Sequence, residues 1–117
     1  GNVMKSKYYR LTCFGIGIYE YLKKYIWNNY QEPVKVWNDF ISDDNVNWLK
    51  KPSIYSQNLN CYSYFTRLGY MQFKKKTLPI IKKFIDINCI FCEVKEFSYD
   101  DIIYQDEYQI VIKNTKF

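Results

Sequence analysis

The chain has 117 residues, a length typical of one domain. Its 17 Lys and Arg against 12 Asp and Glu give a formal charge of +5, and its 48% of hydrophobic residues exclude an intrinsically disordered chain. The sequence has no histidine, which excludes histidine–metal sites and every imidazole acid–base or Ser–His mechanism.

The first part of the chain is predicted to form a strand and then a helix. Aromatic and β-branched residues dominate 7–13, which is typical of a strand, and Gly15 and Gly17 should end it. Apolar residues then recur at helical spacing, with lysines on the other side, which predicts a helix over about 18–28.

A second helix is predicted over about 33–41, with a proline in its first turn, where a missing N–H is tolerated. The i, i+3 spacing of Trp37 and Phe40 places both rings on one face, so we expect them to be core residues. Turn-forming residues then predict an irregular loop over 42–59, and loops of this length are often functional.

The middle of the chain repeats the order of strand and helix. Residues 60–66 are predicted to form a strand, and the Thr66 hydroxyl is placed to cap the helix predicted over about 67–76. A further helical segment is expected over about 78–85, and Pro79 must either kink this helix or restart it.

The last third of the chain is predicted to be β-structure. Residues 88–97 form a strand, and 101–113 alternate as one long strand or as a hairpin that turns near 105–107. With Gly1–Val3 set aside as a cloning remnant before the first methionine, 1–117 is expected to be a single small α+β domain. Its sheet should be mixed or antiparallel, with three to four helices packed on it.

The four cysteines allow a weak zinc hypothesis. Cys89 and Cys92 form a C-x-x-C motif, and Cys13 and Cys61 would be the other ligands. The two residues between the first pair are apolar, however, and positions three apart point to opposite faces of a strand. We therefore predict buried thiols and no metal.

Compartment and partners are only weakly constrained. No apolar run approaches the ~18 residues that span a bilayer, and 1–10 lack the apolar stretch of a signal peptide, so we expect a cytoplasmic protein without membrane contact. The lysine clusters are spread along the chain, which favours solvated helix faces. Lysines together with Tyr and Phe can form a groove on which nucleic-acid bases stack, but the sequence has no recognised nucleic-acid-binding motif.

Three short motifs on predicted strands carry candidate chemistry. They are Tyr9-Arg10-Leu11-Thr12, Tyr62-Ser63-Tyr64-Phe65-Thr66 and Gln105-Asp106-Glu107. A carboxylate beside a neutral amide suits the stabilisation of an oxocarbenium-like sugar. An arginine on a neighbouring strand offers a planar fork for a phosphate, and a serine or threonine beside it can hold a ribose or a carboxamide.

In this order the three motifs resemble those of mono-ADP-ribosyltransferases of the Arg–Ser–Glu type. The resemblance implies that NAD is a substrate and that ADP-ribose passes to a macromolecular acceptor, either a protein or a nucleic acid. It also implies that Glu107 and Gln105 are catalytic and that the residues that bind NAD are Arg10, Thr12, Ser63, Tyr64 and Thr66.

The alternative is a binding module without chemistry, such as a toxin-neutralising immunity protein or a phage-encoded inhibitor. A small size and 21% aromatic residues fit this hypothesis, because Tyr and Trp are enriched where proteins bind proteins. The two hypotheses differ in geometry. An enzyme requires Arg10, Ser63 and Glu107 to converge on one concave pocket, whereas a binding module requires an exposed aromatic patch.

Overall fold

The computed structural model describes most of the chain. The described residues are 5–27, 35, 38–39, 48–49, 52 and 60–113. Trp37, Phe40 and most of 42–59 lie outside them, so the predictions made for those residues stay predictions.

The described residues form an α+β fold, as predicted. The strands are β1 (Lys5–Cys13), β2 (Ile16–Gly17), β3 (Cys61–Phe65), β4 (Ile90–Ser98), β5 (Ile102–Gln105) and β6 (Gln109–Lys113). The helical turns are α1 (Ile18–Tyr21), η1 (Leu22–Trp27), α3 (Arg67–Gln72), η3 (Phe73–Thr77), α4 (Leu78–Ile81), η4 (Ile87–Cys89) and η5 (Tyr99–Asp101). Because α1 continues into η1, and α3 into η3 and α4, the described part of the chain has two longer helical segments, fewer than the three to four predicted.

The chain divides into two compact units, which are described separately below. The first unit comprises Gly1–Arg10, Leu49–Met71 and Val94–Phe117, and the second comprises Leu11–Trp48 and Gln72–Glu93.

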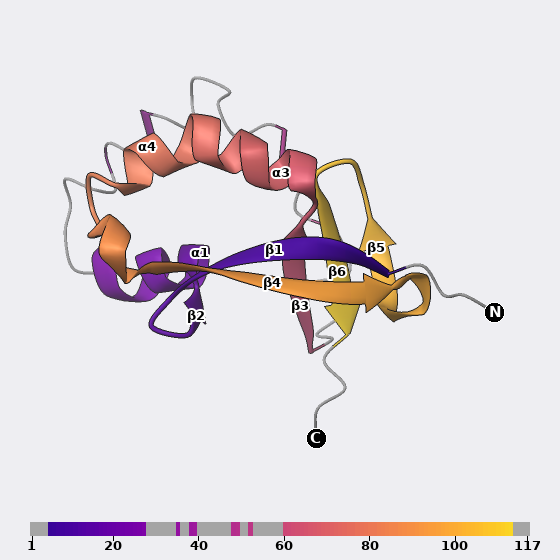
Figure 1. The fold of residues 1–117 in the computed structure, drawn as a ribbon. Coiled ribbons are helices and arrows are strands. Elements are labelled where there is room, and N and C mark those ends of the chain that lie inside the picture. The colour runs from indigo at the N-terminus through magenta and orange to yellow at the C-terminus, as the bar shows by residue number, and fades with distance from the viewer. Residues whose placement is uncertain are drawn as a thin grey trace. The chain divides into compact units, whose positions relative to one another are not determined.

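The strands form a six-stranded sheet in the order β2-β1-β3-β6-β5, with β4 also paired to β1 (Figure 1). The resolved registers are antiparallel. In the first unit Tyr9 pairs with Phe65, which pairs with Gln109. Partners across a sheet share a face and neighbours along a strand alternate, so these pairings assign the residues of β3, β6 and the first-unit part of β1 to one of two faces.

One face of the first unit carries a hydrophobic core. Tyr8, Tyr64, Ile110 and Ile112 are buried together. Phe97 of β4 packs on this cluster, with its ring centroid 4.9 Å from that of Tyr64 and perpendicular in orientation. Aromatic rings thus fill the space that a core of this size would otherwise fill with aliphatic side chains.

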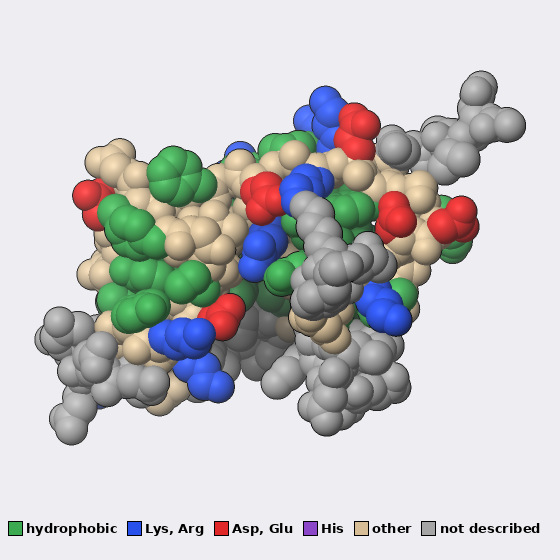
Figure 2. Space-filling model, turned by 90° about the horizontal axis from the view of Figure 1, so that it is seen from below, with side chains coloured by type: hydrophobic (Ala, Val, Ile, Leu, Met, Phe, Trp, Pro, Cys, Tyr) green, Lys and Arg blue, Asp and Glu red, His purple; other side chains and the backbone are tan. Residues whose placement is uncertain are grey.

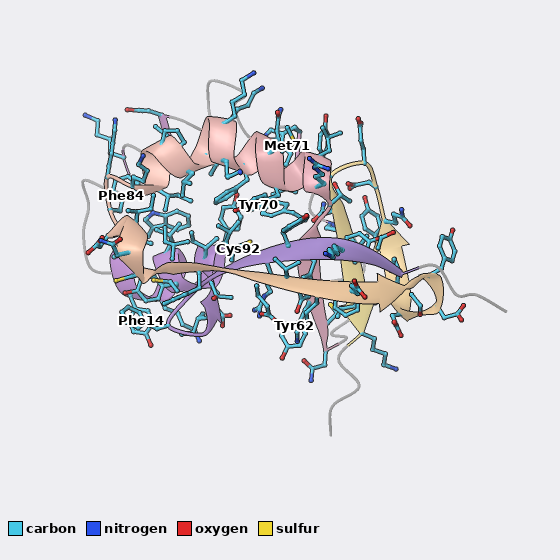
Figure 3. The ribbon with its side chains drawn as sticks, in the orientation of Figure 1. Phe14, Tyr62, Tyr70, Met71, Phe84 and Cys92 are labelled. Atoms are coloured by element: carbon cyan, nitrogen blue, oxygen red, sulfur yellow. The ribbon has the colours of Figure 1, made fainter. Side chains whose placement is uncertain are left out.

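The opposite face of the first unit is covered by α3. The Tyr70 ring stacks on Tyr9 with 4.9 Å between ring centroids, and Figure 3 shows Tyr70 pointing from α3 toward the strands while Met71 points away. Gly69 lies against the backbone of Tyr108, where a Cβ atom would overlap the carbonyl group. Only glycine permits this close approach of helix and hairpin.

The second unit is built around two helical segments. Leu22, Phe73, Thr77 and Ile81 are fully buried, and the Phe73 ring meets Tyr19 edge-on at 6.1 Å. Pro79, which was predicted to kink or restart the helix, lies in the first turn of α4, where the helical segment changes from π-helical to α-helical hydrogen bonding without a break. The preceding η3 is a π-helical turn, and this wider turn accommodates a ring that would clash with the carbonyl of a regular α-helix.

The β1–β2 hairpin was not predicted. Cys13 pairs with Ile16, so the loop consists of Phe14 and Gly15 alone. Both residues have positive φ, 52° and 79°. Two positive φ values are what a two-residue type I′ turn requires. Gly15 therefore reverses the chain rather than only ending the strand.

Candidate functional site

Arg10 lies on the core face of the first unit, at the edge of the hydrophobic cluster. Its guanidinium is 5.0 Å from the centroid of the Tyr62 ring, within the range of a cation–π interaction. In the register set by Tyr9 and Phe65, Arg10 lies opposite Tyr64. That residue pairs with Ile110, which pairs with Gln105. Arg10 and Gln105 thus end one row across four strands, which separates their backbones by about 14 Å in a flat sheet.

Ser63 lies on the other face of this sheet. It pairs with Val111 and alternates with Tyr62 and Tyr64 along β3. The register therefore does not bring Ser63 to Arg10. Sequence reasoning could not find this separation, because it depends on which residues pair between strands that are far apart in the chain.

Two further predicted NAD-binding residues are buried. Tyr64 is a core residue beneath Phe97, and Thr12 is buried in the second unit. Their burial gives each a packing role in the fold.

Thr66 is the predicted helix cap. The Gly69 N–H donates to its Oγ1 at 3.1 Å, and its own hydroxyl donates to the Glu107 carbonyl at 2.7 Å. The Thr66 N–H also donates to the Tyr108 carbonyl at 3.0 Å. One residue therefore satisfies a donor in the first turn of α3 and fixes the backbone of the loop between β5 and β6.

That loop forms a hairpin around Asp106, so the hairpin alternative is confirmed. The carboxylate accepts the backbone N–H groups of Tyr108 at 2.8 Å and Gln109 at 3.0 Å. It also accepts the Tyr104 hydroxyl at 2.9 Å and the Gln109 amide at 3.3 Å. Burial opposes ionisation, yet these hydrogen bonds outweigh it and lower the pKa of Asp106. The sequence signal that could have identified this turn is Asp106 itself, because aspartate is favoured in turns.

The hairpin separates the polar side chains that flank Asp106. Gln105 and Glu107 are exposed, but Gln109 is buried and turned toward Asp106. Gln105 ends β5 and Glu107 lies in the loop, so the two do not share one extended strand. The Glu107 carboxylate is exposed on a backbone that Thr66 holds in place.

All four cysteines are free thiols. Burial was predicted correctly for Cys13 and wrongly for Cys92, which is exposed on β4. Within the described ranges no three Cys, Asp or Glu side chains gather as a potential metal site. No helix in the described part of the chain is long and apolar enough to cross a membrane.

Three aromatic rings form a partly exposed row of contacts on the second unit, with exposed Phe14 and Tyr25 at its ends and half-buried Tyr21 between them. Phe14 and Tyr21 have ring centroids 5.9 Å apart, and Tyr21 and Tyr25 have centroids 5.0 Å apart. The Phe14 side chain is 67% exposed and Tyr25 is 49% exposed. Figure 3 shows Phe14 at the β1–β2 turn, and in Figure 2 hydrophobic side chains gather on the side where Figure 1 draws β2 and α1. We call Phe14, Tyr21 and Tyr25 the aromatic row.

Comparisons of this chain with protein-family models, with curated proteins and with solved structures find no match. The function is therefore inferred from the geometry described above.

Proposed function

We propose that the chain is a non-enzymatic module that binds another protein through the aromatic row. The observation that carries this proposal is the conformation of Phe14. Its φ of 52° lies in the left-handed region, which Gly and Asn adopt readily and bulky residues rarely do. The ring that this conformation presents to solvent is also the most exposed of the row.

The strained backbone of Phe14 supports a role for the aromatic row in binding. An Asn at this position would fit the turn at a lower conformational cost, and no burial of the Phe14 ring compensates for that cost. Strained residues concentrate where a protein binds or reacts. An exposed aromatic side chain in contact with a second ring, as Phe14 is with Tyr21, is also the kind of anchor that dominates protein interfaces.

The charges beside the row favour an acidic partner. Lys23 and Lys24 are exposed in η1 and lie in the sequence between Tyr21, the last residue of α1, and Tyr25. Lys24 is paired with Glu20 at 3.1 Å, and the chain as a whole carries +5. We therefore infer a partner surface with apolar side chains bordered by carboxylates, whose association would be faster at low salt.

The test compares the wild type with Phe14→Asn, which removes the ring and suits the turn. The control is Phe91→Ser, which removes another exposed ring from the second unit. A protein captured by the wild type and the control should be purified and titrated by calorimetry. Its Kd should rise at least about tenfold with Phe14→Asn, the scale of losing a small hot spot. Equal affinity for the wild type and Phe14→Asn would contradict the proposal.

The transferase remains a second candidate because of one observation. The Glu107 carboxylate is exposed on a backbone that Thr66 holds, and Arg10 and Gln105 lie in one row of the same unit. A fixed carboxylate could stabilise positive charge on a ribose as the nicotinamide bond breaks. In this candidate the arginine would bind the pyrophosphate of NAD.

Labelled NAD tests this candidate directly. The wild type should release nicotinamide and transfer label to an acceptor, and Glu107→Gln should lower turnover by about a hundredfold. Arg10→Lys should instead weaken NAD binding, because an ammonium group lacks the guanidinium fork. Glu96→Gln, at an exposed position on β4, is the matched control and should leave turnover unchanged. Wild-type protein that releases no nicotinamide would exclude this function.

A further inference from the structure

Two thiols of the second unit lie at the same end of a strand pair. β1 ends at Cys13, and β4 begins at the residue that follows Cys89. β1 and β4 are paired, and Figure 1 shows them running in opposite directions. The end of one strand therefore lies beside the beginning of the other.

The surroundings of the two thiols agree with this placement. Cys89 ends the turn η4, where its N–H donates to the Asp86 carbonyl at 2.9 Å and fixes its backbone. Burial raises the pKa of Cys13, the charge of Cys89 raises it further, and a hydrogen bond from Tyr21 opposes both. Burial and the charges of the same two thiols raise the pKa of Tyr21. These causes agree with a position of Cys89 and of the Tyr21 hydroxyl near Cys13.

We propose that Cys13 and Cys89 are a redox-sensitive pair that hydrogen peroxide converts into an intrachain disulfide. Cys13 is the last residue of β1 and Cys89 directly precedes β4, so the pairing of these strands brings the two cysteines near one another. Neighbouring Cα atoms on antiparallel strands are about 4.5–5.5 Å apart, a distance that a disulfide can span. This proposal does not depend on the aromatic row or on any activity of the chain.

The neighbouring C-x-x-C cysteine is a poor partner on geometric grounds. Residues 90–92 belong to β4 and are extended. At about 3.3 Å per residue, the Cα atoms of Cys89 and Cys92 are about 10 Å apart. A disulfide requires less than about 7 Å. The exposed thiol of Cys92 can be oxidised, but it cannot bridge to Cys89 without a change in the strand.

The reaction proceeds in two balanced steps. The half-buried Cys89 thiolate attacks one peroxide oxygen and the O–O bond breaks, which gives a sulfenic acid and hydroxide. The hydroxide takes up the proton that the Cys89 thiol released and becomes one water. The Cys13 thiolate then attacks the sulfenic sulfur and displaces hydroxide, which leaves as a second water with the proton from Cys13. The two thiols lose two electrons and two protons in total, and one peroxide becomes two waters.

Peptide mapping tests the proposal on the reduced full chain. After treatment with a small excess of hydrogen peroxide, remaining thiols are alkylated in denaturant and the digest is read by mass spectrometry without reduction. The peptides of Cys13 and Cys89 should be linked, and thiols able to react should fall from the four present to two. Cys61→Ser and Cys92→Ser should leave this link intact, and Cys89→Ser should abolish it.

Three results would overturn the proposal. They are a link from Cys89 to Cys92, a link that involves Cys61, and a Cys13 that stays fully open to alkylation when Cys89 has been oxidised. Each is read from the wild-type digest, so a variant that fails to fold does not prevent a decision. Addition of dithiothreitol should restore four alkylated thiols if the link is a disulfide.

Discussion

The Asp106 carboxylate organises the β5–β6 hairpin, so its removal should destabilise the first unit. Two backbone and two side-chain donors converge on it. We expect Asp106→Ala to lower the free energy of unfolding by about 2–3 kcal/mol, because hydrogen bonds to a charged acceptor are lost and donors are left unpaired. Urea denaturation measures this change. Asp100→Ala, at an exposed position in η5, should cost less than about 0.5 kcal/mol.

The lowered pKa of the Asp106 carboxylate predicts how the stability of the fold depends on pH. The pKa of Asp106 is lower in the folded chain than its usual value, so its contribution is fully present above about pH 4, the unfolded pKa, and is lost as pH falls through the folded pKa. Denaturation at pH 6, 4 and 2.5 should therefore show a smaller acid loss for Asp106→Asn than for the wild type. Equal losses would mean that the carboxylate is not the group that titrates.

Gly69 should not tolerate even one added methyl group. A Cβ atom there would overlap the Tyr108 carbonyl and lie 2.8 Å from its carbon, which is backbone and cannot rotate away. We expect Gly69→Ala to cost about 1–3 kcal/mol, although alanine favours a helix by about 1 kcal/mol. Met71→Ala, exposed on the same helix, is the control for helix propensity. A Gly69→Ala variant more stable than the wild type would contradict the close approach.

Phe14 should be a position where stability can be increased. We expect Phe14→Asn to raise the free energy of unfolding by about 0.5–1 kcal/mol, because Asn adopts positive φ more readily. Phe14→Leu keeps an apolar side chain at the same φ and should bring no gain. Thermal and urea denaturation of both variants decides the matter. Destabilisation by Phe14→Asn would mean that the contact with Tyr21 outweighs the backbone strain.

At the scale of elements, the π-helical turn η3 depends on the residue that begins it. Phe73 is fully buried and meets Tyr19 edge-on, so this ring joins the two helical segments of the second unit. Burial raises the pKa of Tyr19, and the neighbouring Thr77 hydroxyl partly opposes this. We expect Phe73→Ala to cost about 3–5 kcal/mol, the range for removing a buried aromatic ring. Phe91→Ala, at a 61% exposed ring, should cost below about 1 kcal/mol in the same urea experiment.

Most described elements could be predicted from the sequence, because local composition and the spacing of apolar residues determine them. The strand predicted over 60–66 matches β3, and the helix predicted over 67–76 matches α3 and η3, whereas the segment predicted over 78–85 is helical only to Ile81, where α4 ends. The two-residue β2 could not be predicted, since nothing local shows that a phenylalanine adopts positive φ. The geometry of the candidate site was harder to predict, because it depends on residues that are far apart in the sequence. The separation of Ser63 from Arg10 follows from strand register, and the contacts of Asp106 and of the aromatic row follow from packing.

For the whole molecule, the order of the strands predicts that backbone amides exchange at different rates in different strands. In the first unit β6 lies between β3 and β5, and Ile110, Val111 and Ile112 are buried. In the described part of the sheet, β5 pairs with β6 alone. Amides of β6 should therefore exchange at least about tenfold more slowly than those of β5, because an edge strand opens without the rest of the sheet. Hydrogen exchange followed by NMR or mass spectrometry tests this, and faster exchange in β6 would contradict the strand order.

Position 14, in the turn formed by Phe14 and Gly15, affects both the stability of the fold and the binding of a partner. Selection experiments can separate these two effects. A library randomised at position 14 and sorted for resistance to proteolysis should become enriched in Asn, Gly and Asp, the residues that suit a type I′ turn. The same library sorted for partner binding should retain aromatic residues. Divergent outcomes from one pool would show that this position trades stability for recognition, and identical outcomes would show that the turn is a matter of folding alone.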